Sequence, residues 1–439
     1  MADASTIFAL SSGPGKAGVA VIRVSGPAAR DALVRMAPPD VLNRRAALRR
    51  IVHPVTGDVL DQALVLYFAG PRSETGEDVA EFQVHGGRAV VRAVLDALGA
   101  VPGCRMAEPG EFARRAFANG KLDLVEIEAL ADLVEAETEA QRRLALRSGA
   151  VLSTLYEGWR TRLIEIAALV EAAIDFSDEG DVGAKSFSMA RTRAIPLLAE
   201  IRTHLDDGHR GEILRDGFRV AILGAPNAGK SSLLNALARR EAAIVSEEAG
   251  TTRDVIEVRL DLGGLPVIVS DTAGLREAAG TIEREGIRRS LEAADDAQLV
   301  LWLTETGLDS PPESISRETS LTILTKCDLP QSESPQAHLL AISTKTGAGV
   351  DALIRLIAAR AAEAAGSHSD QPVITQARHR QQLEASARSL ETFLEGDPEA
   401  VELRAEDVRR AAHALGCITG RVDVEDVLGE IFGRFCIGK

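Results

Sequence analysis

The chain has 439 residues, of which 45% are hydrophobic and 26% charged, and its formal net charge at pH 7 is −15. This length predicts two or three domains, and the composition is typical of a globular protein rather than a disordered or membrane-spanning one. Because an acidic chain repels a polyanion, we expect any contact with RNA to be local or to be made through a partner.

The first ten residues carry no positive cluster ahead of an apolar stretch, and no segment reaches the roughly 18 uncharged apolar residues that span a bilayer. We therefore expect a cytoplasmic protein that does not use a membrane. The four cysteines, Cys104, Cys327, Cys417 and Cys436, lack CxxC spacing. Their scatter argues against a zinc site or a disulfide framework and predicts reduced thiols.

In chain order, residues 1–118 contain β-type runs such as 19–24 and 63–68, punctuated by glycine and proline. This pattern predicts a mixed α+β domain. From residue 122 to 174 apolar residues recur at helical spacing with Glu and Arg between them, which predicts long amphipathic helices.

Between residues 218 and 364 the pattern changes to short β-type runs that alternate with helical segments. The runs are 218–223, 255–262, 265–270, 299–303, 321–325 and 339–343. Gly263 and Gly264 predict a hairpin between the second and third runs, and the other runs indicate a mostly parallel sheet with helices on both faces.

Helical periodicity returns over residues 377–435, after a polar linker around 366–371. The α/β unit is therefore expected to be inserted into a helical domain. The predicted division is an N-terminal domain over 1–118, a helical domain over 119–215 and 377–439, and an α/β domain with its linker over 216–376.

Residues 224–231, GAPNAGKS, fit the phosphate-loop pattern GxxxxGK[ST]. The motif follows the β-type run 218–223 and precedes the helical run 232–239, which is the context that it requires. Glycines let backbone N–H groups close around phosphates, Lys230 neutralises the β- and γ-phosphates, and the Ser231 hydroxyl can bind Mg²⁺. The predicted nucleotide contacts here are Asn227, Ala228, Gly229, Lys230, Ser231 and Ser232.

Two further segments stand in the order that a GTPase requires. Asp271-Thr272-Ala273-Gly274 ends the third run, where a carboxylate can hold the magnesium shell and Gly274 N–H can reach the γ-phosphate. About 20 residues upstream, a first switch loop contains Thr251 and Thr252, and Thr252 is expected to be the second magnesium ligand.

Guanine rather than adenine is indicated by Thr325-Lys326-Cys327-Asp328. The Asp328 carboxylate can accept N1–H and the exocyclic amine of guanine, whereas adenine would leave it unpaired. Thr325 stands where Asn is usual and keeps only a hydroxyl. Ser343-Thr344-Lys345 follows where a GTPase offers a backbone N–H to guanine O6. Together these motifs predict a P-loop GTPase domain.

Leu275 stands where many regulatory GTPases have the Gln that orients the attacking water. Because an apolar side chain cannot position water, either hydrolysis is negligible or another group acts, with Glu277 and Glu283 as candidates. On the sequence alone, the preferred interpretation of each is a glutamate on a solvated helix face. The sequence shows no obvious arginine finger. The side-chain oxygen of Asn227 lies beside the phosphates, where a monovalent cation could replace an arginine.

With these residues in place, the chain closely resembles the MnmE (TrmE) family of tRNA modification GTPases along essentially its whole length. The resemblance rests on TIFA at 6–9, GVAVIR at 18–23, GEDV at 76–79, HGG at 85–87, AEPGEF at 107–112, NGKLD at 119–123 and CIGK at 436–439.

This resemblance implies a potassium-activated GTPase whose GTPase domains dimerise across their nucleotides. Potassium would be coordinated by Asn227, Ser246, Glu248 and Thr251, mostly through backbone carbonyls, and Glu283 would orient the hydrolytic water. Family members usually carry uncharged residues around Glu248, so Ser246-Glu247-Glu248 is a departure. If these side chains enter the site, the potassium preference is lost.

The resemblance also implies that residues 1–118 homodimerise and bind a tetrahydrofolate derivative, either the 5-formyl or the 5,10-methylene form. Arg23, Glu81, Lys121 and Lys439 would lie near it. Arginine and lysine suit the folate carboxylates, and a glutamate suits the donor edge of the pterin. Folate would carry the one-carbon unit, and Cys436 would be either a nucleophile near it or inert.

Members of the family act with a flavin-binding partner, MnmG (GidA), as a heterotetramer that adds a carboxymethylaminomethyl-type group to the wobble uridine of certain tRNAs. The partner would supply FAD chemistry and much of the tRNA surface, in keeping with the acidic charge of this chain. One alternative is a switch GTPase for ribosome assembly without one-carbon chemistry. Another is a mechanical or membrane-associated GTPase, although the sequence shows no basic amphipathic anchor or lipidation signal.

Overall fold

The computed structural model describes residues 5–13, 15–176, 180–240, 242–244, 256–271, 296–306, 311–312, 315–316, 318–329, 340–366, 372–422, 425–433 and 438. They divide into two compact units, Met1–Ala131 with Gly416–Lys439, and Asp132–Leu415. The division into three domains expected from the sequence stays a prediction.

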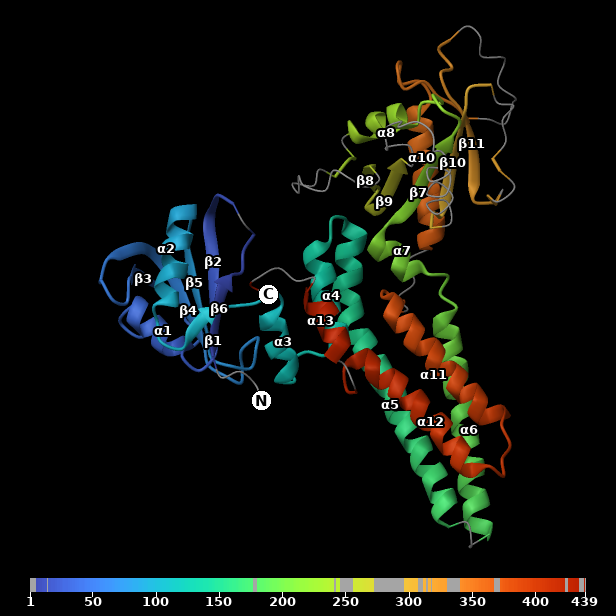
Figure 1. Cartoon of the computed structure of the whole chain (residues 1–439), viewed down its shortest axis with the longest axis horizontal. Coiled ribbons are helices and arrows are strands. Elements are labelled where there is room, and N and C mark those ends of the chain that lie inside the picture. The colour runs from blue at the N-terminus through green and yellow to red at the C-terminus, as the bar shows by residue number, and fades with distance from the viewer. Residues whose placement is uncertain are drawn as a thin grey trace, which may run out of the picture. The chain divides into compact units, whose positions relative to one another are not determined.

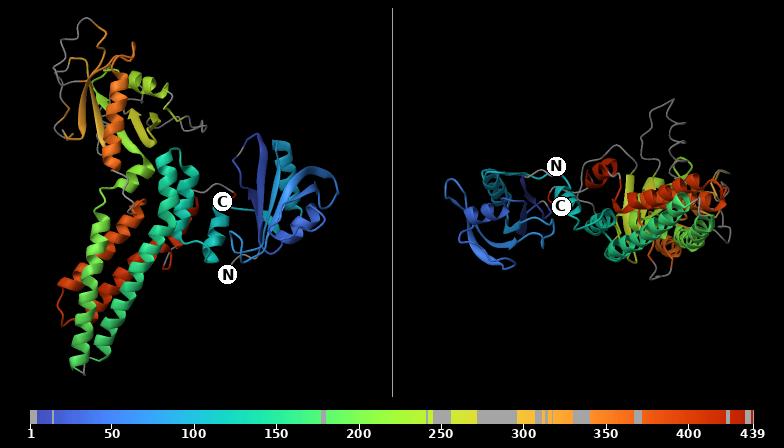
Figure 2. Two further views of the ribbon diagram at one scale, coloured as in Figure 1. Left: turned by 180° about the vertical axis from the view of Figure 1, so that it is seen from behind. Right: turned by 90° about the horizontal axis from the view of Figure 1, so that it is seen from below.

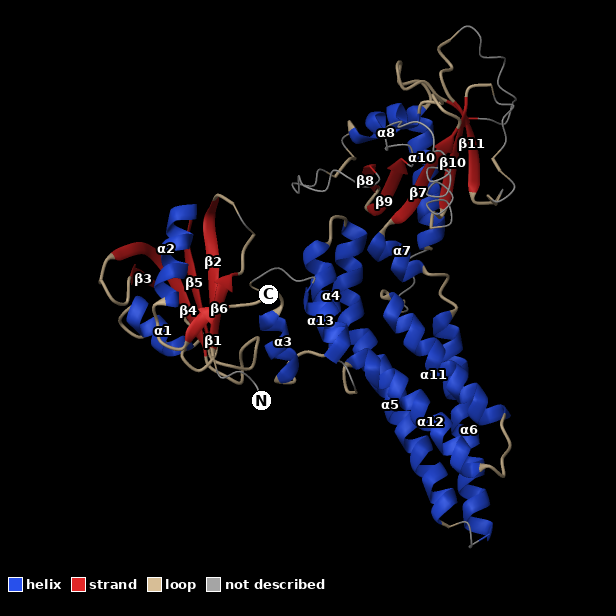
Figure 3. Cartoon of the chain, in the orientation of Figure 1, coloured by secondary structure: helices blue, strands red, loops and turns tan. Residues whose placement is uncertain are grey.

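The first unit is built on a six-stranded sheet of order β3-β4-β5-β2-β1-β6, in which only the β1–β6 pair is parallel (Figure 3). Its strands are β1 (Thr6–Leu10), β2 (Ala17–Ser25), β3 (Ala47–Val52), β4 (Val59–Phe68), β5 (Val79–Gly86) and β6 (Cys104–Met106). The β-type runs predicted at 19–24 and 63–68 lie in β2 and β4.

Alternation along the strands gives this sheet two faces with different partners. Ile22, Phe82 and Val65 are neighbours in one cross-strand row and are completely buried. The helices α1 (Ala29–Met36) and α2 (Arg88–Gly99) cover that face. The adjacent row places Arg23 opposite Glu81, on the face away from these helices.

A small helical cluster completes the first unit. It contains α3 (Glu111–Ala118), the beginning of α4 (Leu124–Glu135) and α13 (Glu425–Gly433), joined by an apolar core that includes Leu124, Ile127 and Phe432. Gly110 begins α3 with a φ of 66°, and a Cβ there would lie 2.6 Å from the carbonyl oxygen of Phe432. This close approach requires glycine.

Five helices, four of them long, form one part of the second unit as far as the structure describes it. They are α5 (Glu139–Asp175), α6 (Gly180–Leu205), α7 (Arg210–Asp216), α11 (Ala377–Glu395) and α12 (Val401–Thr419), of which α12 ends in the first unit. The long α5 runs beside α6 (Figure 1, and Figure 2, left). Its buried residues recur every three or four positions, as in Leu152, Tyr156, Trp159 and Leu163, which confirms the amphipathic helix predicted there.

The other part of the second unit is a six-stranded sheet of order β12-β11-β10-β7-β9-β8. Its strands are β7 (Phe218–Gly224), β8 (Ile256–Leu262), β9 (Leu265–Asp271), β10 (Leu299–Thr304), β11 (Ser320–Leu324) and β12 (Leu340–Ala341). All pairs are parallel except β8–β9, a hairpin whose Gly263 and Gly264 both have positive φ. The mostly parallel sheet and its hairpin are confirmed.

Two helices, α8 (Lys230–Ala238) and α10 (Val350–Ala365), pack on one face of this sheet through Leu233, Leu237, Leu353 and Ile357. The chain enters the sheet after α7 and returns to the helices at α11, which packs against α6. The predicted fold class, an α/β unit inserted between helices and preceded by an α+β unit, is therefore confirmed. Within the described residues, no helix is long and apolar enough to span a bilayer.

Candidate functional site

The phosphate-loop motif lies between the end of β7 and the start of α8. Gly224 has a φ of 147°, and a Cβ at this position would meet the Leu303 carbonyl oxygen at 2.4 Å. Asn227 and Gly229 also have positive φ, at 64° and 93°. These conformations fold residues 225–229 into a tight loop, and the free N–H groups of the first turn of α8 follow directly.

Lys230 curls back over this loop. Its ammonium donates to the carbonyl oxygens of Gly224 and Ala225, both at 2.9 Å. Burial lowers the pKa of Lys230, and the carboxylate of Asp271 opposes that shift. A cation held at the loop in this way can neutralise phosphate oxygens.

Ser231 and Asp271 meet at the adjacent edge of the sheet. Strand β9 pairs in parallel with β7 and ends on Asp271, so its carboxylate comes beside the first turn of α8. Ser231 Oγ donates to Asp271 Oδ2 at 2.7 Å, and Asp271 is 1% exposed. A hydroxyl and a carboxylate are hard oxygen donors of the kind that Mg²⁺ prefers.

The segments predicted to recognise guanine follow β11 and β12. Thr325 is buried, and its hydroxyl and N–H both donate to the Thr304 carbonyl, which fixes the start of the loop. Asp328 is exposed, and a hydrogen bond with the Ser343 side chain lowers its pKa, with Lys345 adding to the shift. The carboxylate of Asp328 and the loop after Ser343 are thus brought together.

Lys326 has a φ of 56° and forms an ion pair with Glu305, which follows β10. The sequence analysis did not single out Glu305. The available signal was its place directly after the third parallel strand, because carboxyl ends of neighbouring parallel strands share one edge of the sheet.

In the first unit, strand register brings two of the predicted folate residues together. Arg23 and Glu81 are cross-strand partners, and the guanidinium donates to Glu81 Oε1 through Nε at 3.2 Å and through the terminal nitrogen Nη2 at 3.1 Å. Lys121 Nζ donates to the Pro71 carbonyl at 3.1 Å. Arg23 also pairs with Glu74, which the sequence analysis missed because β2 and the loop before β5 are far apart in the chain.

Of the other predicted site residues, Ala228 is buried, while Ser232, Thr344 and Lys345 are partly or fully exposed. Some predictions fall outside the residues that the structure describes. These are Ser246, Glu248, Thr251, Thr252, Thr272, Ala273, Gly274, Glu283 and Lys439.

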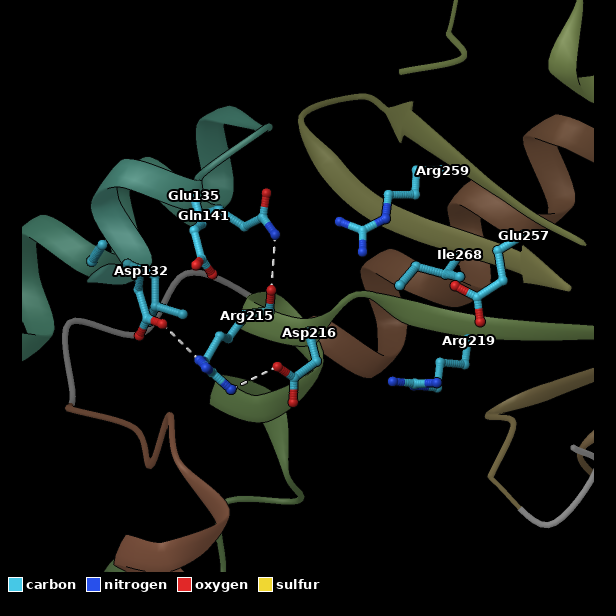
Figure 4. A pocket seen from close by; sticks show the side chains of 11 residues that line it. Asp132, Glu135, Gln141, Arg215, Asp216, Arg219, Glu257, Arg259 and Ile268 are labelled. Carbon is cyan, nitrogen blue, oxygen red and sulfur yellow. Dashed lines mark hydrogen bonds and ion pairs between the residues drawn. The ribbon is translucent and has the colours of Figure 1, made fainter. Parts of the chain in front are cut away.

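A charged cavity of about 230 Å³ lies between the sheet and the helices of the second unit (Figure 4). Arg215 in its wall donates to Asp132 at 2.7 Å and to Asp216 at 2.7 Å, and its carbonyl accepts from Gln141 at 2.8 Å. Gln141 also closes the capping box with Thr138 that starts α5. None of the predicted nucleotide residues lines this cavity. We call it the seam, because it lies between the helices and the sheet of the second unit.

Family models match both parts of the chain. Residues 6–121 match the model described as GTP-binding protein TrmE N-terminus, and residues 124–436 match the MnmE helical domain.

Full-length relatives agree with those matches. The tRNA modification GTPase MnmE of Parvibaculum lavamentivorans is 54% identical over 444 residues, covering 99% of this chain and 100% of the relative. The protein of the same name from Methylorubrum populi is 52% identical over 439 residues, covering 99% and 98%. Among solved structures, Era from Aquifex aeolicus is 21% identical, with a TM-score of 0.27, and covers 41% of this chain and 69% of that chain.

Proposed function

The chain belongs to the MnmE family of tRNA modification GTPases, and from this membership we propose that it hydrolyses GTP to GDP and phosphate in the modification of the tRNA wobble uridine. The observation that carries the proposal is the meeting of Ser231 with Asp271 at 2.7 Å, directly beside the phosphate loop. A phosphate cradle, a cation and two hard oxygen donors are what Mg²⁺-assisted phosphoryl transfer requires.

In the proposed complex, residues 227–232 and 271–274 hold the phosphates. Ser231 and Thr252 bind Mg²⁺, with Asp271 supporting the magnesium shell. The base lies against Thr325, Lys326 and Asp328 and against the loop 343–345. Glu283 orients the hydrolytic water.

Base selectivity tests this arrangement most directly. We expect the purified chain to bind GTP in calorimetry and to take up ATP at least about a hundredfold more weakly, because adenine leaves the Asp328 carboxylate unpaired. The variant Asp328→Asn should lose affinity for GTP and gain affinity for xanthosine triphosphate, because the 2-oxo group of xanthine accepts a hydrogen bond where the 2-amino group of guanine donates one. Equal uptake of ATP and GTP by the unaltered chain would remove the assignment.

We also propose that potassium activates the hydrolysis, held by Asn227, Ser246, Glu248 and Thr251 across a dimer of GTPase domains. GTP turnover in potassium chloride should then exceed turnover in sodium chloride at the same ionic strength. Equal rates in the two salts would contradict the potassium site and leave the GTPase assignment standing.

The one-carbon chemistry is proposed for the first unit. Arg23, Glu81, Lys121 and Lys439 would hold a 5-formyl or 5,10-methylene tetrahydrofolate in a homodimer. A flavin-dependent MnmG partner, in a heterotetramer, would supply redox chemistry and most of the tRNA contact, in keeping with the net charge of −15. The proposed place of action is the cytoplasm.

Deletion of the gene tests the cellular role. Mass spectrometry of tRNA nucleosides should show the loss of a carboxymethylaminomethyl-type group from the wobble uridine. An unchanged nucleoside profile together with defective ribosomal subunits would instead favour a ribosome-assembly GTPase.

A further inference from the structure

A row of arginines follows one edge of the sheet in the first unit. Two of them precede β3, which is an edge strand of that sheet, and two lie on it (Figure 1). We call this set the arginine edge; its members are Arg44, Arg45, Arg49 and Arg50. The sequence has no carboxylate between Asp40 and Asp58, so the segment that contains these arginines is purely cationic.

Other arginines of the first unit show how a charge is neutralised there. Arg30 and Arg35 on α1 pair with Asp40 and Asp31, at 2.6 and 2.7 Å. Within the part of the chain that the structure describes, no member of the arginine edge has such an ion pair. Positive charge is therefore left uncompensated at this edge of a chain whose net charge is −15.

Backbone carbonyls and an aromatic ring orient two of these guanidinium groups. The guanidinium of Arg44 donates to the Arg72 carbonyl and lies over the Phe68 ring, 5.7 Å from its centroid. Arg49 donates to the carbonyl oxygens of Pro39 at 3.3 Å and of Leu48 at 3.0 Å. Contacts with neutral groups position a guanidinium without cancelling its charge, and its remaining N–H groups can bind a further acceptor.

The charges are spread along the edge rather than gathered at one point. The N–H of Arg44 donates to the Tyr67 carbonyl near the end of β4, whereas Arg50 is the cross-strand partner of Gln62, nearer its start. At about 3.3 Å per residue, these two places on β4 lie roughly 17 Å apart. One small anion cannot reach both, but the phosphates of a nucleic-acid strand recur along its length.

Protection of a free sheet edge explains only half of this pattern. Charged side chains on an edge strand oppose pairing with another sheet, and Arg49 and Arg50 on β3 are placed to do so. Arg44 and Arg45 precede the strand, where there is no ladder to protect. A surface for a polyanion uses all four, and guanidinium groups suit phosphate oxygens because they can donate two parallel hydrogen bonds.

We infer that the arginine edge contacts the phosphate backbone of the tRNA on which this chain acts. The inference rests on the proposed function and deepens it, because it gives this acidic chain a local RNA contact in addition to those of the proposed partner. Phosphate contacts position an RNA without reading its sequence. The arginine edge therefore contributes affinity and orientation, and it does not choose between tRNAs.

Fluorescence anisotropy of a labelled tRNA transcript, with an unmodified uridine at the wobble position, measures this contact on the full chain. The test variant combines Arg45→Gln with Arg50→Gln, because both side chains are exposed and form no hydrogen bond with any described residue. In 50 mM potassium chloride it should bind tRNA at least about fivefold more weakly, and its slope of log affinity against log salt concentration should be shallower by about two. GTP turnover without tRNA should be unchanged, since neither residue belongs to the proposed nucleotide site.

The matched control combines Arg88→Gln with Arg92→Gln, which removes the same charge from exposed positions on α2. This helix packs on β1 and β6, at the other edge of the sheet, so the control should keep its affinity for tRNA. Equal weakening by the two variants would overturn the inference, because total charge rather than its place would then matter. Unchanged binding by the test variant, or no binding by the unaltered chain in 50 mM salt, would also overturn it.

Further outcomes separate the inference from the proposed function. A test variant that changes self-association in ultracentrifugation but not tRNA binding would overturn the inference and make the arginine edge a contact between copies of the chain. Unaltered tRNA nucleosides after gene deletion, together with weaker binding by the test variant, would remove the proposed function and leave the RNA contact standing.

Discussion

His204, near the end of α6, should make the second unit less stable at mildly acidic pH. Its ring nitrogen Nε2 lies 3.2 Å from the Tyr156 hydroxyl, and its ring packs edge-on to Trp159 with centroids 5.4 Å apart. Burial lowers the pKa of His204 to about 4; Arg380 and His379 add to the shift, and Asp207 opposes it. The folded protein therefore holds this imidazole neutral well below the pH at which an unfolded chain protonates it.

The size of the effect follows from linkage. The unfolded imidazole has a pKa of about 6.5, so the stability contributed by neutral His204 is complete above that pH and falls as the pH drops toward about 4. The full shift of about 2.5 pH units corresponds to roughly 3 kcal/mol. A pH of 5 lies about 1.5 units below the pKa of the unfolded imidazole. The free energy of unfolding should therefore be about 2 kcal/mol lower at pH 5 than at pH 7.5.

Urea unfolding followed by tryptophan fluorescence measures this difference. The chain has two tryptophans, so a Trp302→Phe background leaves Trp159 as the reporter beside His204. In that background His204→Gln should lose about 2 kcal/mol less stability between pH 7.5 and pH 5 than the parent. The exposed His413, replaced by Gln, serves as the control. Equal losses in the parent and in His204→Gln would refute the reasoning.

Three further substitutions probe charges of different burial. Burial raises the pKa of Glu111 but hydrogen bonds from Arg105 and Arg115 outweigh it, so the shift is downward and the stabilisation is lost as pH falls below about 4.5. Glu111→Gln should therefore reduce the fall in melting temperature that thermal unfolding shows between pH 7 and pH 3.5. An unchanged fall would contradict this. Arg380→Leu leaves the buried Asp207 carboxylate without its 2.7 Å partner and should cost about 3 to 5 kcal/mol in urea unfolding, with part recovered by adding Asp207→Asn. Arg259→Ala breaks a partly exposed ion pair with Glu137, and a double-mutant cycle on the two residues should give a coupling free energy below about 1 kcal/mol. A larger value would show that water screens this pair less than the exposure of its side chains indicates.

The phosphate loop, the β8–β9 hairpin and α5 could be predicted from the sequence, because each depends on residues close together in the chain. The phosphate loop needs a strand, a glycine-rich turn and a helix within about 20 residues, and residues 218–238 contain all three in order. The Gly263-Gly264 hairpin is likewise local, since two positive φ angles are what the turn demands. Helical periodicity identified α5 because one face of a long helix must be apolar to pack.

Ion pairs between residues far apart in the chain could not be predicted from the sequence in the same way. Arg23 and Glu81 are separated by 58 residues, and only the register of β2 against β5 sets them opposite one another. Glu74 joins them because Thr75 is anchored beneath the loop, an arrangement that no spacing rule describes. Ion pairs of this kind depend on which strands become neighbours.

The sequence by itself determined the class of the protein, because a nucleotide-binding loop and amphipathic helices are encoded by residues close together in the chain. The tertiary structure decided which charges meet: Ser231 with Asp271 beside the phosphate loop, and Arg23 with two glutamates in the first unit. The physical reason is that water and salt screen the interaction between two charges beyond about 10 Å. The partners of a charge are therefore fixed by folding and not by distance along the chain.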